Sequence, residues 1–221
     1  MIRAARTAFS DIWSPPFRSV FWKALGLTVA LLLVIWIALQ AALGTFMVLP
    51  WHWVETLIEI VAGFGSLILM AFLIAPITSA IAGIFLDDVA EVVEDTHYPL
   101  DPKGQALPFV QSIAQTIRFT LIVIGVNIVV LLLLLLPGIN LIAFFVANGY
   151  LLGREYFELA AQRHMSREEV ADLRRAKGGQ MFLGGIVIAG FLAIPLLNLL
   201  TPLFATAFMV HLVKGIRAGE V

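Results

Sequence analysis

The sequence has no cysteine among its 221 residues, and only 13% of the residues are charged. The absence of cysteine excludes disulfide bonds, thiolate metal sites and cysteine nucleophiles. A soluble domain carries roughly a quarter charged residues, so the low charged fraction excludes an ordinary soluble enzyme and a disordered chain. The formal net charge is −1, so no excess of positive charge would attract a nucleic acid.

Hydrophobic residues make up 61% of the chain, and its mean hydropathy is +0.98. Four stretches, 24–54, 60–86, 119–153 and 178–213, contain no Asp, Glu, Lys or Arg. A bilayer core of about 30 Å is crossed by roughly 20 helical residues, and each stretch exceeds that length. The composition therefore predicts an all-α integral membrane protein that forms a single membrane domain over residues 1–221.

The first two stretches each suit one long transmembrane helix. We predict these helices at 17–50 and 54–95, the second with an acidic extension into the cytoplasm. Pro50 and two tryptophans lie between them, where an interfacial aromatic belt is expected. Residues 2–13 alternate bulky apolar and polar side chains, which is typical of a helix lying in the membrane interface.

The last two stretches are too long for one span, and each has a proline near its middle. Their shorter limbs reach only about 20 to 22 Å at 1.5 Å per residue, which is less than the bilayer core. We therefore predict two partially inserted, re-entrant helical hairpins at 119–153 and 180–214. Asn140 and Asn198 follow the prolines and are expected to cap the returning limbs. Turns at membrane depth need protein cover, which favours a homo-oligomer.

The positive charges support this topology. Six of the 14 Lys and Arg residues lie in 154–177, and none lies in 51–59. Two hairpins place every basic residue on one side, so the positive-inside rule predicts cytoplasmic termini. An alternative stays open, because six short helices that each cross the membrane completely would place the basic residues on the same side. Within 154–177 we expect polar helices, one of them opened by a capping box of Ser166 and Glu169.

Catalytic motifs are scarce, and we expect no enzyme, no cofactor and no metal site. His211 lies inside the last apolar stretch, close to its end, and an intramembrane hydrolase would need a nucleophile such as Ser66 or Ser79 beside it. No motif supports that pair, so His211 is expected to be hydrogen-bonded or interfacial. The acidic run at 87–95 is interpreted as a solvated helix face rather than a metal site. Gly149 to Gly153 forms a small-xxx-small face for close helix packing, inside the fold or between subunits.

One polar segment precedes the first long helix, with the sequence Ser-Pro-Pro-Phe-Arg-Ser at 14–19. Two prolines define the start of a helix, and the free N–H groups that follow carry a partial positive charge. Phe17, Arg18 and Ser19 would therefore form a cradle for an oxyanion. The alternative is a simple elbow, with Arg18 reaching lipid headgroups. Asn140 and Asn198 would line the path from this cradle at the hairpin tips.

Several blocks resemble the CysZ-type sulfate permeases of bacteria. They are the leucine-rich run that ends at Leu136–Ile139, the Ile-Pro-Leu-Leu-Asn-Leu block at 194–199 with Pro202 after it, and Ile-Ala-Pro at 74–76. The resemblance extends from about residue 10 to 215. It implies a multi-pass protein of the bacterial inner membrane with two long transmembrane helices and two partially inserted hairpins, assembled as an oligomer.

The resemblance also implies sulfate entry that supplies cysteine biosynthesis, by a transporter that binds sulfate, contacts the lipid bilayer and has no enzymatic activity. In the family, the sulfate loop reads Gly, an aliphatic residue and Arg, often with a second Arg. Here Arg18 matches the first arginine, Pro16 stands in place of Gly, and Ser19 stands in place of the second arginine. These departures leave an alternative open, a non-transporting membrane scaffold or partner-binding protein with the same fold.

Overall fold

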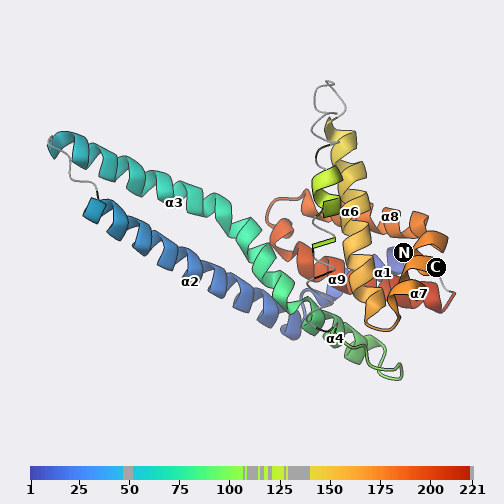
Figure 1. Ribbon diagram of the computed structural model, residues 1–221. Coiled ribbons are helices and arrows are strands. Elements are labelled where there is room, and N and C mark those ends of the chain that lie inside the picture. Colours follow the sequence, from blue (N-terminus) through green and yellow to red (C-terminus); the bar gives the residue numbers. More distant parts are fainter. Residues whose placement is uncertain are drawn as a thin grey trace. The chain divides into compact units, whose positions relative to one another are not determined.

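The structure is a computed structural model that describes residues 1–46, 52–106, 108, 114, 117–118, 121–126, 128 and 140–219. Regular structure in these residues is entirely helical, as predicted (Figure 1). The chain forms two compact units. The first contains Met1–Arg18 and Leu86–Val221, and the second contains Ser19–Phe85.

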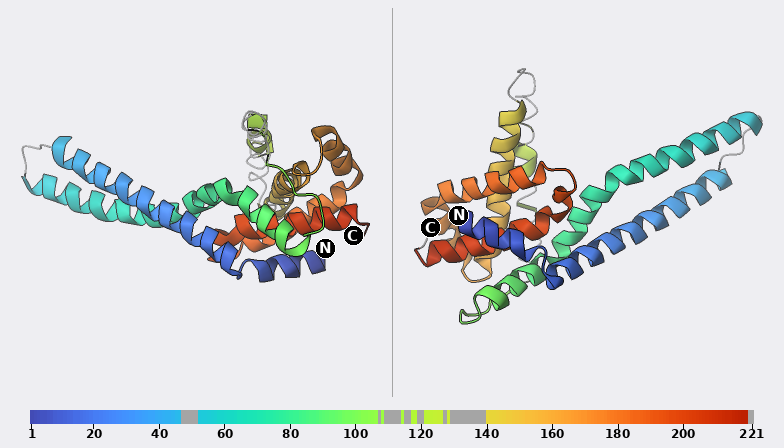
Figure 2. Two further views of the ribbon diagram at one scale, coloured as in Figure 1. Left: turned by 90° about the horizontal axis from the view of Figure 1, so that it is seen from below. Right: turned by 180° about the vertical axis from the view of Figure 1, so that it is seen from behind.

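The second unit is a pair of long helices, α2 (Pro15–Phe46, whose first residues belong to the first unit) and α3 (His52–Ala82). They run side by side in the views of Figures 1 and 2. The Trp36 Nε1–H donates to Ser66 Oγ over 3.1 Å, which links α2 to α3. Ala24 also packs into a small core with Ile81 and Ala82.

Apolar side chains on both long helices are left without protein cover. Val34 and Ile37 on α2 are 64% and 61% exposed, and Val61 and Phe64 on α3 are 63% and 68% exposed. Such surfaces are stable against lipid and unfavourable in water. Two helical segments among the described residues, Pro15–Ala42 and Leu197–Arg217, are long and apolar enough to cross a membrane.

The first unit is built around α9 (Thr201–Arg217), which is buried along most of its length. The helices packed against it are α1 (Ile2–Asp11), α4 (Leu86–His97), α6 (Asn140–Gln162) and α8 (Gly178–Leu192). Phe204 and Phe208 are stacked inside this core. The apolar side chains of α9 are covered by protein, whereas many apolar side chains of α2 are exposed.

Glycines join α6 to α8, and this confirms the packing role predicted for Gly149 and Gly153. A Cβ on Gly185 of α8 would overlap the carbonyl oxygen of Gly149, and a Cβ on Gly153 would lie 2.5 Å from the carbonyl oxygen of Met181. Side chains at these points would force the backbones apart, so the small residues set the helix separation. The close contact lies within one chain.

The bounds of α7 and α6 can be compared with those predicted from the sequence. Helix α7 (Arg167–Ala176) begins with the predicted capping box, in which Ser166 and Glu169 bond each other's backbone N–H groups. Helix α6 continues without a break from Asn140 to Gln162, through the predicted end of the first hairpin at 153. The tip of that hairpin at 137–139 lies outside the described residues.

The acidic extension of the second long helix is a separate element. Helix α3 ends at Ala82, a 3₁₀ turn follows at Gly83–Phe85, and α4 then begins at Leu86. The interpretation of the acidic run at 87–95 as a solvated helix face holds for Asp87, Asp88, Glu91 and Asp95, which are exposed, but not for Glu94, which is buried beside Val93. Val89 and Ala90 share this buried side, since they recur at helical spacing.

The second hairpin contains α8 and α9, joined through Leu196 and the 3₁₀ turn η2 (Leu197–Leu200). Leu196 has a φ of 69°, a left-handed conformation that reverses the chain. The prediction that Asn198 caps the returning limb is wrong. Asn198 lies inside η2, and the residue that precedes α9 is Leu200, followed by Thr201 and then Pro202.

Candidate functional site

The start of α2 carries the predicted oxyanion cradle. The Ser14 N–H donates to the Asp11 carbonyl over 2.9 Å, and the Arg18 N–H donates to the Ser14 carbonyl over 3.0 Å. The prediction that the Arg18 backbone N–H is free is therefore wrong, and Ser19 already lies within the helical hydrogen-bond ladder. The groups left for an anion are the Phe17 N–H and the exposed side chains of Arg18 and Ser19.

The side chain of Phe17 is only 3% exposed and anchors this turn. A cavity of about 190 Å³ lies beside it, lined by Asp11, Ser14, Pro16 and His97 among others. The cavity places the first turn of α2 against the last turn of α4. The cradle is therefore held by tertiary contacts as well as by its two prolines.

The two asparagines predicted at the hairpin tips are not brought to this turn. Helix α6 begins at Asn140, whose side chain lies outside the described part of the structure. Asn198 is half-buried in η2, and no hydrogen bond joins it to Arg18. A path lined by both asparagines stays a prediction.

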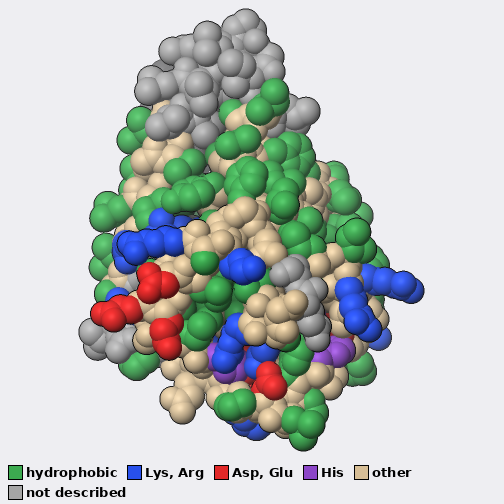
Figure 3. Space-filling model, turned by 90° about the vertical axis from the view of Figure 1, so that its right-hand side faces the viewer, with side chains coloured by type: hydrophobic (Ala, Val, Ile, Leu, Met, Phe, Trp, Pro, Cys, Tyr) green, Lys and Arg blue, Asp and Glu red, His purple; other side chains and the backbone are tan. Residues whose placement is uncertain are grey.

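A second cluster of cationic side chains was missed in the sequence. A cavity of about 80 Å³ is lined by charged residues together with small apolar ones, and the charged residues are Arg118, Arg154, Arg167, Arg174 and Glu158. Four arginines face one glutamate, so the lining has an excess of three positive charges. Figure 3 shows Lys and Arg side chains gathered with acidic ones and histidines on part of one face, beside a region of hydrophobic side chains.

Glu158 organises two of these arginines. Its Oε1 accepts from Arg154 Nε over 2.9 Å and lies 3.2 Å from Arg174 Nη1. Arg154 is only 7% exposed and also donates to the Tyr150 hydroxyl over 3.2 Å. Guanidinium groups held in this way present planar donor pairs that match a tetrahedral oxyanion. Sequence reasoning used these residues only as evidence of topology, because α6 and α7 bring them together in space.

A buried ion network supports the neighbouring loop. Arg163 donates to Glu94 through Nε and Nη2 at 3.0 and 3.2 Å, and to Asp87 through Nη1 at 2.8 Å. Glu94 Oε2 also accepts from the Gly104 N–H over 3.2 Å. Burial acts to raise the pKa of Glu94, but the hydrogen bonds and charges of Arg163 and His164 outweigh it and lower that pKa. Glu94 is therefore ionised at neutral pH.

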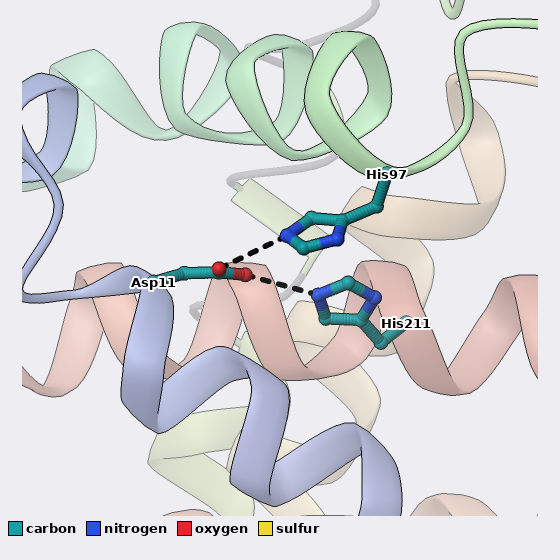
Figure 4. A group of neighbouring side chains, drawn as sticks. All are labelled: Asp11, His97 and His211. Carbon is teal, nitrogen blue, oxygen red and sulfur yellow. Dashed lines mark hydrogen bonds and ion pairs between the residues drawn. The ribbon is translucent and has the colours of Figure 1, made fainter.

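A third cluster joins Asp11 of α1, His97 of α4 and His211 of α9 (Figure 4). Asp11 Oδ1 lies 3.0 Å from His97 Nε2, and Asp11 Oδ2 lies 3.1 Å from His211 Nε2. The other ring nitrogen of His211 is 2.9 Å from the Tyr98 hydroxyl. His211 is thus hydrogen-bonded, as predicted, and its partners are 113 and 200 residues away in sequence.

A sequence model of one family, described as sulfate transporter CysZ/etoposide-induced protein 2.4, matches residues 4–202. The chain belongs to the CysZ/etoposide-induced protein 2.4 family. No curated protein matches the chain in a sequence search. The match covers most of α1, all of α2, the residues that line the arginine-lined cavity, and α8.

Membership of the CysZ family confirms the resemblance found in the sequence. The family is one of transporters rather than enzymes, and it indicates a role related to sulfate transport. The family and the apolar helices together indicate a membrane protein.

Proposed function

We propose that the protein is a sulfate permease of the bacterial inner membrane that supplies sulfate for cysteine biosynthesis. The observation that carries the proposal is the arginine-lined cavity between α6 and α7, in a chain of the CysZ family. An excess of positive charge in a small cavity favours a divalent oxyanion over a monovalent one, because the Coulomb energy doubles with the charge.

Sulfate would first meet the start of α2, where the Phe17 N–H, the Arg18 guanidinium and the Ser19 hydroxyl remain available. The helix N-terminus adds about half a positive charge, so the turn would replace part of the hydration shell of the ion. The hairpin tips near Asn140 and Asn198 would then line the route. The chain has no nucleotide-binding motif, so the ion would move down a gradient or with another ion.

The arrangement in the bilayer follows from the same physics. Helices α2 and α3 would span the membrane, and the hairpins at 119–153 and 180–214 would enter it without crossing. Helix α8 has 15 residues, or about 22 Å, which is shorter than a 30 Å core. The segment Leu197–Arg217 is long enough to cross, but it is mostly buried by protein and would therefore not face lipid along its length. Copies of the chain in a homo-oligomer would cover the turns, and both termini would be cytoplasmic.

Uptake of radioactive sulfate into liposomes that contain the purified protein tests the function. We expect uptake by the wild type and a strong reduction in Arg18→Ala and in Arg174→Gln. Arg175→Gln is the matched control for the second variant, because Arg175 is 80% exposed and lies outside the cavity. Removal of one charge-assisted hydrogen bond is expected to weaken sulfate binding by about 10- to 100-fold.

The negative outcomes separate the parts of the proposal. No uptake by the wild type would refute the permease. Equal uptake by wild type and Arg18→Ala would exclude the cradle, and equal uptake by Arg174→Gln would exclude the cavity. Binding without preference for sulfate over chloride, with a stable co-purifying protein, would instead support a scaffold.

Reporter tags test the topology separately. One tag is inserted between α6 and α7, next to Arg167, and another is fused to the C-terminus. Both are expected to react only from the cytoplasmic side. Opposite sidedness of the two tags would show that the second hairpin crosses the membrane.

A further inference from the structure

We propose that Asp11, His97 and His211 form a binding site for a divalent transition-metal ion, with zinc as the closest fit. The three residues each offer one ligand atom, and these atoms lie within 4.8 Å of one another. The site is independent of the proposed sulfate function, because it uses none of the residues assigned to the anion.

The donor set matches this class of metal. Two imidazole nitrogens and one carboxylate oxygen are ligands that zinc and its neighbours in the first transition row bind well. Zinc lies about 2.0 to 2.2 Å from such atoms, so neighbouring ligands around a tetrahedral ion are about 3.3 Å apart. Asp11 Oδ1 lies 3.0 Å from His97 Nε2 and Asp11 Oδ2 lies 3.1 Å from His211 Nε2, so each histidine is close to this value from one oxygen of the carboxylate, and the whole set stays within 4.8 Å.

Both imidazole rings present Nε2 to the same carboxylate, as Figure 4 shows. The ring planes of His97 and His211 are inclined at 73°, with centroids 4.9 Å apart, so the rings do not stack and both nitrogens remain directed at Asp11. Three ligands that converge from α1, α4 and α9 leave a fourth position open for water. This arrangement is that of a three-ligand zinc site.

Tyr98 provides the outer hydrogen bond that metal-bound histidines require. Its hydroxyl lies 2.9 Å from His211 Nδ1. When His211 Nδ1–H donates to the Tyr98 oxygen, the lone pair of Nε2 faces Asp11, and a cation between them removes the repulsion of the two acceptors. Such partners orient the ring, and their loss costs about 10- to 100-fold in metal affinity.

The burial of the three ligand side chains and the cleft beside them are also compatible with a bound metal ion. The side chains of His211, Asp11 and His97 are 6%, 14% and 31% exposed, so the ligands are held in place while one edge remains open. His97, Tyr98 and His211 line a cleft of about 680 Å³ that provides a path for the ion. Lys214 lines the same cleft, and Asp101 offsets its charge at 2.7 Å.

Titration of the purified full-length protein, free of any histidine tag, with Zn²⁺ and with Co²⁺ tests the proposal. We expect one ion per chain by calorimetry, a visible Co²⁺ spectrum typical of four nitrogen and oxygen ligands, and a rise in melting temperature with Zn²⁺. Addition of EDTA should reverse all three effects.

Variants assign the site to its residues. His97→Gln, at the most exposed ligand, should weaken zinc binding at least tenfold, and Asp11→Asn should do the same. Tyr98→Phe should weaken it about 10- to 100-fold while the Co²⁺ spectrum is retained, because only the outer hydrogen bond is lost. His52→Gln is the control, since His52 begins α3 in the second unit.

Two results would overturn the proposal. One is the absence of Zn²⁺ binding to the folded wild type at millimolar metal. The other is binding with the same affinity in wild type, His97→Gln and Asp11→Asn. If His211→Gln fails to fold, the spectrum of wild-type protein and the two milder variants still decide the question.

Discussion

Gly149 and Gly185 hold α6 and α8 so close together that a Cβ atom on Gly185 would overlap the carbonyl oxygen of Gly149. This contact fixes the position of α6, which carries Arg154 and Glu158 of the arginine-lined cavity. The geometry of the cavity therefore depends on a pair of residues that have no polar side chain.

Gly185→Ala should destabilise the protein by about 1 to 3 kcal/mol, because the new methyl group has no space against the α6 backbone. Tryptophan fluorescence during thermal unfolding in detergent measures the change. Gly190→Ala is the matched control on the same helix, with nothing within 4 Å of its Cβ position. Its effect should be neutral or stabilising by about 0.5 to 1 kcal/mol. Equal destabilisation by both variants would argue against the close contact.

Glu94→Gln should lower the free energy of unfolding by about 1 to 3 kcal/mol. The variant removes the buried counter-charge that accepts two hydrogen bonds from Arg163, which keeps its pair with the half-exposed Asp87. Asp95→Asn removes the neighbouring pair with Lys103, whose side chains are 50% and 71% exposed, and should cost less than about 1 kcal/mol. Denaturant titration of both variants gives the comparison, and a similar loss in both would contradict the buried network.

His164 and Glu94 should each contribute a decline in stability as the pH falls from 7.5 to 4. Glu155, whose pKa burial raises to about 7, opposes that decline because it binds its proton more tightly in the folded state. Burial lowers the pKa of His164 below its ordinary value of 6.5, in spite of the opposing effect of Glu94. The pKa of Glu94 is lowered below 4.5 because Arg163 and His164 outweigh the effect of burial.

His164 and Glu94 bind protons more weakly in the folded state than in the unfolded state, so their protonation favours unfolding. The decline begins near pH 6.5 through His164 and continues below pH 4.5 through Glu94. Melting temperatures at five pH values measure it. Glu94→Gln should flatten the part below pH 4.5, and an unchanged slope there would show that other carboxylates cause the loss.

Glu158→Gln should tighten sulfate binding about three- to thirtyfold at low ionic strength. The substitution removes the one negative charge among the arginines of the cavity, so Arg154 and Arg174 become available to the anion. Isothermal titration calorimetry with sulfate measures the affinity, and 0.5 M potassium chloride should reduce the gain through screening. Glu168→Gln, on the exposed face of α7, should leave the affinity unchanged. Weaker binding in Glu158→Gln would mean that Glu158 positions the arginines rather than competing with the anion.

Local sequence was sufficient to predict several elements. Two prolines at 15 and 16 begin α2, Ser166 and Glu169 cap α7, and Gly149 with Gly153 allows close packing. Each of these depends on residues within one or two helical turns, which are adjacent in any helical conformation. Predictions failed where packing competed with local pattern, as at Asn198, where the chain turns through Leu196 and the helix starts later.

The sequence by itself determined that this chain is helical and apolar, and that it resembles one family of sulfate permeases. The reason is that hydrophobic run length and short motifs are properties of contiguous residues. Only the tertiary structure decided that Arg118, Arg154 and Arg174 share a cavity and that Asp11 lies between His97 and His211. Residues 86 and 200 positions apart come together through helix packing, which a linear pattern of residues does not encode.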